Sequence, residues 1–385
     1  MTGEVDAARP IWAEIELGAI THNIGRIRER AGRPVRLIVP VKANAYGHGA
    51  VAVGRHLEQI GVDAIATANI DEAIELRTAG VRLPILMYAS QLPAATSRLV
   101  AHGLTPTIAD RAGLAAAAAA AREEPVAVHV EVDAGFGRLG VRFDEAAAFV
   151  AAVVAEPRVY LEGIYTHVPF SDDGGAAWAR RRITAFGELV RQIEAMHGIR
   201  IRYAQATASS AVIDSIPDEL NTIAPGHLTY GISPIDEVHA EDLGFRQALR
   251  AIRALVIHVG RREPGDDLAT GSPDATVRTA VLLVGIDNGY ELTAGASVLL
   301  RGNRCPVLSV NAEYTVIDTS SQPGVVVGDV ATIVGRDGAD ALSLHDVAAL
   351  AGRSAGYWMM GFRRMPLRYQ GSAQIRTSVA PQPIS

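Results

Sequence analysis

The chain has 385 residues, of which 49% are hydrophobic and 20% are charged, as in an ordinary globular protein. Its formal net charge of -6 excludes the strongly basic surface with which proteins bind nucleic acids or anionic membranes. The length suffices for two or three domains, one of which can be a barrel.

The single cysteine, Cys305, excludes an intramolecular disulfide and a thiolate metal cluster, and we predict no metal site. This cysteine usage fits a reducing compartment. Residues 1–6 are acidic and lack the apolar core of a secretory signal. The sequence contains no run of about 18 apolar residues that would span a bilayer. We therefore expect a cytoplasmic protein that binds neither nucleic acid nor membrane.

Strand and helix patterns alternate along the first part of the chain. Residues 11–17 alternate like a strand, and Thr21 is a plausible N-cap for a helix that runs toward Arg30. Single strands then follow with helices between them, at residues 37–39, 64–68, 84–88, 105–109, 126–132, 161–166, 202–206 and 222–224. Eight such units favour an α/β fold, a closed (β/α)8 barrel of the TIM type, which we assign to residues 11–235.

The pattern changes near Pro234, where the acidic residues 236–242 indicate a connector. Short β-rich runs separated by turn residues follow it. One helix is expected at residues 344–351. We predict a mostly β C-terminal domain over residues 245–370 and a loose tail over residues 371–385.

Lys42 stands just after the apolar strand 37–39 and before two glycines, Gly47 and Gly49, that lead into a helix. Burial at a strand end disfavours the charged ammonium and lowers its pKa. A lysine in such a place is a candidate to form a Schiff base with a carbonyl group. From position alone, the simpler interpretation is that Lys42 bends into solvent.

Three further residues follow predicted barrel strands, at the end of the barrel where reactive groups sit. Arg138 belongs to a glycine-rich loop, and by itself it is best explained as a surface arginine. A lone histidine such as His167 is more often structural than catalytic. Ser210 precedes an apolar helical run, so it can be an ordinary N-cap or, with Gly226 and His227, part of an anion site.

Residues 42–49, Lys-Ala-Asn-Ala-Tyr-Gly-His-Gly, resemble almost letter for letter the lysine motif of the alanine racemase family, whose cofactor is pyridoxal 5'-phosphate (PLP). The resemblance covers nearly the whole chain, from Trp12 to Tyr357. It implies a fold type III PLP enzyme with a barrel and a C-terminal β domain, acting on a small amino-acid substrate. It also implies a head-to-tail homodimer in which each active site is completed by the second subunit's β domain.

The resemblance assigns roles to individual residues. Lys42 would form the Schiff base with PLP, Arg138 would hydrogen-bond the phenolic oxygen of PLP, and His167 would lie against the cofactor ring. The phosphate would be held by Tyr46, Ser210, Gly226, His227 through its backbone, and Tyr357. In such a site the cofactor acts as electron sink, while the protein contributes placement and electrostatics.

Three positions depart from the family pattern. Glu131 stands where the family usually carries a lysine, often carbamylated, and a glutamate could still orient Arg138 through a charge-assisted hydrogen bond. Ala224 replaces an arginine that points at the pyridine nitrogen and limits how much carbanion charge enters the ring. Ile286 replaces the tyrosine that is the family's second base, and isoleucine cannot carry a proton.

Racemisation by the family's route needs two bases on opposite faces of the substrate carbon. The first hypothesis is an amino-acid racemase or epimerase whose second base has moved to Asp287, Tyr290, Glu313 or Tyr314. The second is a PLP enzyme of the same fold with another outcome, such as decarboxylation, retro-aldol cleavage or side-chain chemistry. The third is a PLP-binding protein without turnover, although single-domain barrels of that kind lack a C-terminal β domain.

Overall fold

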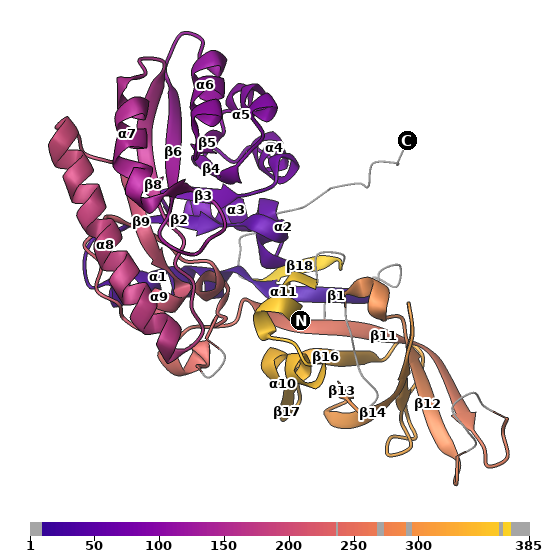
Figure 1. The fold of residues 1–385 in the computed structure, drawn as a ribbon. Coiled ribbons are helices and arrows are strands. Elements are labelled where there is room, and N and C mark those ends of the chain that lie inside the picture. Colours follow the sequence, from indigo (N-terminus) through magenta and orange to yellow (C-terminus); the bar gives the residue numbers. More distant parts are fainter. Residues whose placement is uncertain (1–9, 236–237, 268–272, 290–294, 362–364, 371–385) are drawn as a thin grey trace.

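The computed structural model describes residues 10–235, 238–267, 273–289, 295–361 and 365–370. Figure 1 shows two bodies, a barrel coloured mainly indigo to magenta and a β domain coloured mainly orange to yellow. The tail expected over residues 371–385 and the candidate base Tyr290 lie outside the described residues.

Eight parallel strands form a closed barrel, which confirms the predicted fold class. The ring closes because β5 pairs with β6 while β10 pairs with both β9 and β2. A short extra strand, β7 (Val141–Arg142), pairs with β6 outside the ring. The barrel strands are β2 (Arg36–Pro40), β3 (Ala64–Thr67), β4 (Ile85–Ser90), β5 (Thr105–Ile108), β6 (Val126–Asp133), β8 (Val159–Tyr165), β9 (Tyr203–Ala208) and β10 (Thr222–Ala224).

Helices cover the outside of the barrel (Figure 1), so its strands are buried on both faces and read as continuous apolar runs. Side chains cap three of the helices at their N-termini, namely Asn69, Asp110 and Asp172. The helices of this part are α1 (Leu17–Ala31), α2 (Lys42–Tyr46), α3 (Ala50–Gln59), α4 (Ile70–Thr78), α5 (Thr96–Ala101), α6 (Arg111–Ala120), α7 (Ala146–Ala155), α8 (Asp173–His197) and α9 (Ser209–Ile213), with 3-10 turns η1 (Pro93–Ala95), η2 (Phe143–Glu145), η3 (His227–Tyr230) and η4 (Ala240–Leu243).

The expected start of the first helix was wrong. Helix α1 begins at Leu17, and Leu17 and Ile20 are both fully buried, so packing extends the helix ahead of Thr21. The Thr21 hydroxyl instead lies 2.8 Å from Nε2 of His56 on α3.

The second body is a sheet of nine strands with two short helices. Strand β1, from the start of the chain, lies between β11 and β18, antiparallel to the first and parallel to the second. Helix α10, capped by the Ser343 hydroxyl, is the helix expected at residues 344–351, whereas α11 was not expected. The elements are β1 (Ile11–Glu16), β11 (Leu249–Arg262), β12 (Val277–Leu282), η5 (Ile286–Asn288), β13 (Ser297–Leu300), β14 (Asn303–Val310), β15 (Thr315–Asp318), β16 (Val330–Asp337), β17 (Asp340–Leu342), α10 (Leu344–Leu350), α11 (Ala355–Gly361) and β18 (Leu367–Gln370).

One large apolar core joins the two bodies, because it contains residues of α1 and β2 together with residues of β11, β16 and α10. A second core lies between β6, β8 and the helices α7 and α8. Among the described residues, no helix is long and apolar enough to cross a membrane.

Candidate active site

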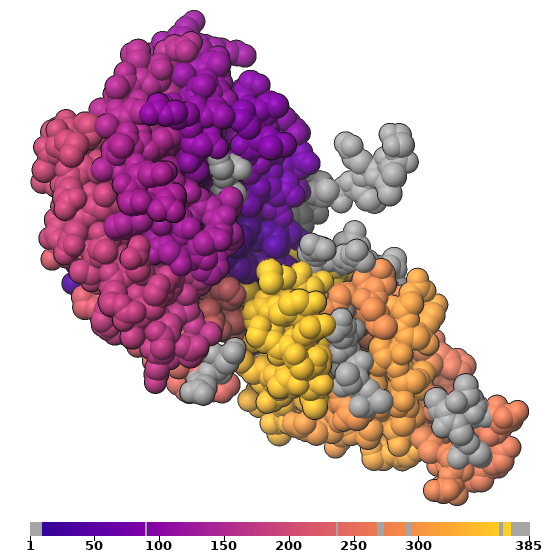
Figure 2. Space-filling model, in the orientation of Figure 1, coloured from indigo at the N-terminus to yellow at the C-terminus, as the bar shows by residue number. Residues whose placement is uncertain are grey.

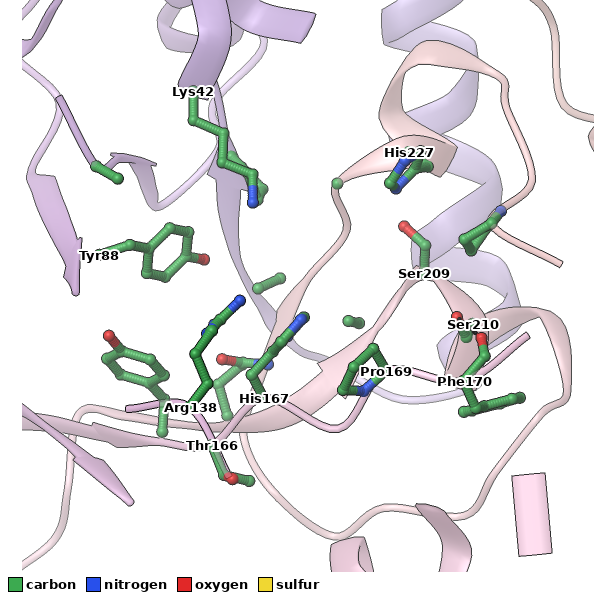
Figure 3. A pocket seen from close by; sticks show the side chains of 18 of the residues that line it. Lys42, Tyr88, Arg138, Thr166, His167, Pro169, Phe170, Ser209, Ser210 and His227 are labelled. Carbon is green, nitrogen blue, oxygen red and sulfur yellow. Dashed lines mark hydrogen bonds between the residues drawn. The ribbon is translucent and has the colours of Figure 1, made fainter. Parts of the chain in front are cut away.

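A cavity of about 650 Å³ opens at the carboxyl ends of the barrel strands. Its walls contain seven of the eight residues proposed from the sequence: Lys42, Tyr46, Arg138, His167, Ser210, Gly226 and His227. In Figure 3 the side chains of Lys42, Arg138 and His167 point into the same space. The barrel topology therefore gathers residues that are up to 185 positions apart in the chain, from 42 to 227.

Lys42 begins an unusual turn. The four residues that follow it, residues 43–46, all have left-handed backbone angles, with φ between 53° and 56°. Such a turn costs about 1–2 kcal/mol per residue for residues other than glycine. Hydrogen bonds hold it: the amide of Ala45 donates to the carbonyl of Val41 (2.7 Å), and the amide of Asn44 donates to Glu72 (2.7 Å). The surrounding structure thus fixes the direction in which the lysine leaves the strand.

The environment of Lys42 favours its neutral form. Burial lowers the pKa of the Lys42 amine, and the positive charge of Arg138 lowers this pKa further. The amine also lies 5.9 Å from the centre of the Tyr46 ring. A neutral amine is the nucleophilic form, so Lys42 is prepared to attack a carbonyl carbon.

Tyr46 and Gly226 form a tight pair on one wall. The Tyr46 ring packs between those of His227 and Tyr230, with ring centres 5.3 and 5.1 Å apart. A Cβ atom at Gly226 would lie only 2.7 Å from the Tyr46 hydroxyl, so this close approach requires glycine. Burial raises the pKa of Tyr46, which keeps the phenol protonated and able to donate a hydrogen bond.

Arg138 is carried by a loop that Asp133 organises at the end of β6. The Asp133 carboxylate accepts hydrogen bonds from the amides of Gly135 (2.8 Å) and Gly137 (3.0 Å). The guanidinium of Arg138 lies 5.1 Å from the centre of the Phe136 ring, which in turn meets the His167 ring edge-on at 5.4 Å. The loop thereby brings a cation and an imidazole to the same side of the cavity.

Glu131 is buried in the cavity floor, and Tyr165 donates a hydrogen bond of 3.0 Å to its carboxylate. The Tyr165 hydroxyl also lies 3.2 Å from that of Thr107. Burial raises the pKa of Glu131, while the Tyr165 hydrogen bond and the charge of Arg138 oppose this rise. From the sequence we expected Glu131 to orient Arg138 through a hydrogen bond. In the structure the Glu131 carboxylate accepts its hydrogen bond from Tyr165, and the charge of Arg138 acts on the pKa of this carboxylate.

Both cavity histidines are neutral near pH 7. Burial, Arg138 and Lys42 lower the pKa of His167 to about 4. Burial and Lys42 lower the pKa of His227 to about 4 as well. Neutral imidazoles near Lys42 can accept or donate a proton without adding a fixed positive charge.

Two serines follow β9 at the base of α9. The Ser210 hydroxyl donates to the carbonyl of Phe170 (2.9 Å), and the Ser209 hydroxyl accepts from the amide of Leu228 (3.2 Å). The first bond ties the serine turn to the segment after β8, and the second ties it to the 3-10 turn that begins at His227. The wall beside Gly226 is therefore built from polar groups of two strand ends.

Several proposed residues lie elsewhere. Tyr357 is on α11, 52% exposed and outside the cavity lining, with the Arg353 guanidinium 4.8 Å from its ring centre. Ile286, 57% exposed, lies on η5 beyond β12. Three of the residues proposed to act as the second base in place of residue 286 are also exposed and outside the cavity lining of this chain: Asp287, Glu313 and Tyr314.

Several residues that line the cavity were not proposed from the sequence, among them Tyr88, Tyr165 and Gln205. Tyr165 comes two residues before His167 on the same strand end, and this period of two was the signal that could have found it. Ala224 lines the cavity at the end of β10, so the position where the family carries an arginine does face the site.

Comparison with known proteins supports the same assignment over both bodies. Residues 15–234 match the family model for the N-terminal domain of alanine racemase, and residues 252–369 match that for its C-terminal domain. An alanine racemase of Desulfovibrio desulfuricans is 34% identical over 88% of this chain and 93% of its own length. One of Methanococcus maripaludis is 31% identical over 88% of this chain and 92% of its own length.

A solved structure agrees. The crystal structure of alanine racemase from E. faecalis superposes with a TM-score of 0.83 at 29% sequence identity, and the match covers 95% of this chain and 100% of the other. Family members use PLP as their cofactor. The chain is an enzyme of the alanine racemase family.

Proposed function

We propose that this enzyme binds PLP through Lys42 and uses it to labilise a bond at Cα of an amino acid, with racemisation as the first candidate reaction. The observation that carries the proposal is a lysine of lowered pKa, held by a left-handed turn, whose amine enters a cavity at the carboxyl ends of the barrel strands. Family membership supports a racemase-like activity.

The cavity residues fit PLP. The absence of a Cβ at Gly226 lets the Tyr46 hydroxyl come close to this backbone, so a phenol and backbone amides stand together on one wall. We assign the phosphate to this wall, with Tyr46, Ser210, the backbone of Gly226 and the amide of His227 as donors. Lys42 would attach the cofactor, and Arg138 and His167 would border its ring. When bound, PLP would supply an electron sink that makes the bonds at Cα of the amino acid easier to break.

The protein residues then have defined tasks. The lowered pKa of Lys42 makes its neutral amine easier to form, and this amine would take a proton from Cα and return it. Arg138 holds negative charge on the ring side of the cavity, and buried Glu131 partly balances that cation. We propose that Tyr357, which lies outside this cavity on α11, contributes to the phosphate only if α11 shifts.

A second candidate reaction follows from two replacements. Ala224 offers no hydrogen bond where it faces the cavity, and Ile286 cannot donate the proton that would complete inversion. One-sided deprotonation followed by decarboxylation, retro-aldol cleavage or side-chain chemistry therefore competes with racemisation. Inversion requires a second base, and Asp287, Glu313 and Tyr314 are candidates only if another subunit brings them to the cavity.

One experiment separates these outcomes. The PLP-loaded enzyme is incubated in D2O with a panel of L- and D-amino acids, and deuterium at Cα and product chirality are measured together. Deuterium with inversion supports the racemase, and deuterium without inversion or a changed product supports the second candidate. Absence of both exchange and product, matched by a Lys42→Ala control, would reject catalysis at Cα.

We also propose the homodimer and the cytoplasmic location expected from the family. The exposed side chains of Ile286 and Tyr314, on neighbouring loops linked by the Ile286 amide and the Asn311 carbonyl (3.1 Å), support a contact surface there. Light scattering during gel filtration measures the mass directly. A monomer at micromolar concentration would contradict the dimer.

A further inference from the structure

Three potential metal ligands meet at the junction of the two bodies, outside the cavity. His239 and Glu241 belong to the connector around η4, and His345 belongs to α10. One ligand atom of each lies within 4.8 Å of those of the other two. The two imidazole rings meet edge to face, with centres 4.8 Å apart. Figure 2 shows the yellow segment that contains α10 at the surface, beside the barrel.

The connector side of this cluster is held in place. Ala240, between His239 and Glu241, is fully buried, and the amide of Phe245 donates to its carbonyl (3.1 Å). The guanidinium of Arg26 on α1 donates to the carbonyl of Leu243 (3.0 Å). The turn therefore keeps His239 and Glu241 on one surface patch whether or not an ion is bound.

The position of His345 on α10 is equally fixed. His345 is the second residue of α10, between the buried Leu344 and the Ser343 cap on one side and the buried Val347 on the other. Both supports belong to one apolar core, which contains Ala240 as well as Leu344 and Val347.

We propose that His239, Glu241 and His345 bind a divalent transition-metal ion, with zinc as the best match. Two imidazole nitrogens and one carboxylate oxygen are a known zinc donor set, with water as the fourth ligand. Bonds of about 2.0–2.1 Å in a tetrahedron place ligand atoms about 3.4 Å apart, so these side chains need to close by up to about 1.4 Å. Imidazole ligands select such ions over magnesium, which prefers oxygen.

The charges around the cluster suit a cation. Asp242 and Asp346 add carboxylates beside Glu241 and His345. The nearby cation Arg304 is paired with Asp340, at 2.7 and 3.0 Å. The sequence next to two of the three ligands is therefore acidic, and this cation is already neutralised by a carboxylate.

An ion at this position would stabilise the helices next to the cavity. It would join the segment that leaves the barrel to α10, and α10 packs on α11. Gly356 of α11 lies against His227, because a Cβ there would be 2.9 Å from its Nε2. The metal would thus stabilise the helix pair that backs one wall of the cavity, without touching any cavity residue.

The test uses the tag-free, PLP-loaded full chain after chelator treatment and dialysis, because a histidine tag would itself bind metal. Zinc is titrated by calorimetry, and cobalt is titrated as a spectroscopic probe of tetrahedral geometry. The variants are His239→Asn, Glu241→Gln and His345→Asn. The matched control is His258→Asn, since His258 is exposed on β11 and outside the cluster.

We expect one zinc ion per chain, and each cluster variant should bind it at least about 100-fold more weakly, more than the 10- to 100-fold typical of outer-shell groups. Zinc should also raise the thermal midpoint of the wild type and of His258→Asn but not of the cluster variants. Circular dichroism checks that the variants are folded. The proposal is overturned if the wild type binds no zinc, if the cluster variants bind it like the control, or if magnesium binds as well as zinc.

Discussion

The substitution Gly226→Ala tests how the cavity wall is built. The added Cβ would lie 2.7 Å from the Tyr46 hydroxyl, and the next nearest atom is Cζ of the same ring at 3.5 Å. A relaxed contact is about 3.5 Å, so the hydroxyl has to move by about 0.8 Å. The ring has little freedom to do so because His227 and Tyr230 hold it on two sides.

The substitution should lower both the stability of the fold and the affinity for PLP. Overpacking of this size costs about 1–3 kcal/mol, which lowers the thermal midpoint of the protein without PLP by roughly 1 to 4 °C. If Tyr46 donates to the phosphate, displacing its hydroxyl forfeits a hydrogen bond to a charged group, about 1.5–3 kcal/mol. That loss weakens PLP binding by roughly 10- to 150-fold.

The assay is a two-by-two set with Tyr46→Phe, in which PLP affinity is measured by absorbance and stability by thermal unfolding. Without the hydroxyl the alanine fits, so Gly226→Ala should add little to either effect in the Tyr46→Phe background. Gly187→Ala is the matched control, because a Cβ at Gly187 on α8 meets nothing within 4 Å. Equal losses from Gly226→Ala in both backgrounds would refute the Tyr46 contact as their cause.

Three further changes have defined outcomes. Lys42→Ala should prevent covalent attachment of PLP, and a labelled peptide found elsewhere after borohydride reduction would refute the assignment. Burial lowers the pKa of His48 from 6.5 to about 4, so between these values the unfolded chain binds more protons and stability falls as the pH falls, by on the order of 3 kcal/mol. His48→Gln should flatten the dependence of the thermal midpoint on pH over this window, and an unchanged slope would contradict the shift. Ile286→Tyr should raise the rate of inversion relative to Cα exchange by about 10²–10⁴-fold if Ile286 occupies the position of the second base, and an unchanged ratio would place that base elsewhere.

Much of the fold could be predicted because the signals are local. Strands buried on both faces, such as β2 and β3, appear as short apolar runs whatever their neighbours are. The partners of β1 could not be read in this way, since its place between β11 and β18 depends on pairing with segments far along the chain. Thr21 failed as an N-cap for a related reason: burial of Leu17 decided where α1 begins.

In the candidate site, too, the local features could be predicted and the long-range ones could not. Lys42 and His167 could be placed from their positions after strands, because barrel topology brings every such position to one end. The left-handed turn over residues 43–46 could not, since of its two alanines, asparagine and tyrosine only the asparagine favours that backbone. The metal ligand pair His239 and His345 also escaped notice, because only tertiary packing brings η4 to α10.

The charges of the cavity indicate what the divergent residues have changed. Among the residues that line it, Glu131 is the one carboxylate, and it shares the cavity with the Arg138 guanidinium and the Lys42 amine. An arginine at the position of Ala224 would have added a second guanidinium, and would have lowered the pKa of both histidines further. With alanine there, the wall near β10 keeps space and little charge, so a bound ring nitrogen would be free to take a proton. On the proposed function, such a cavity would still hold an anionic cofactor but would exert less control over where the carbanion charge goes.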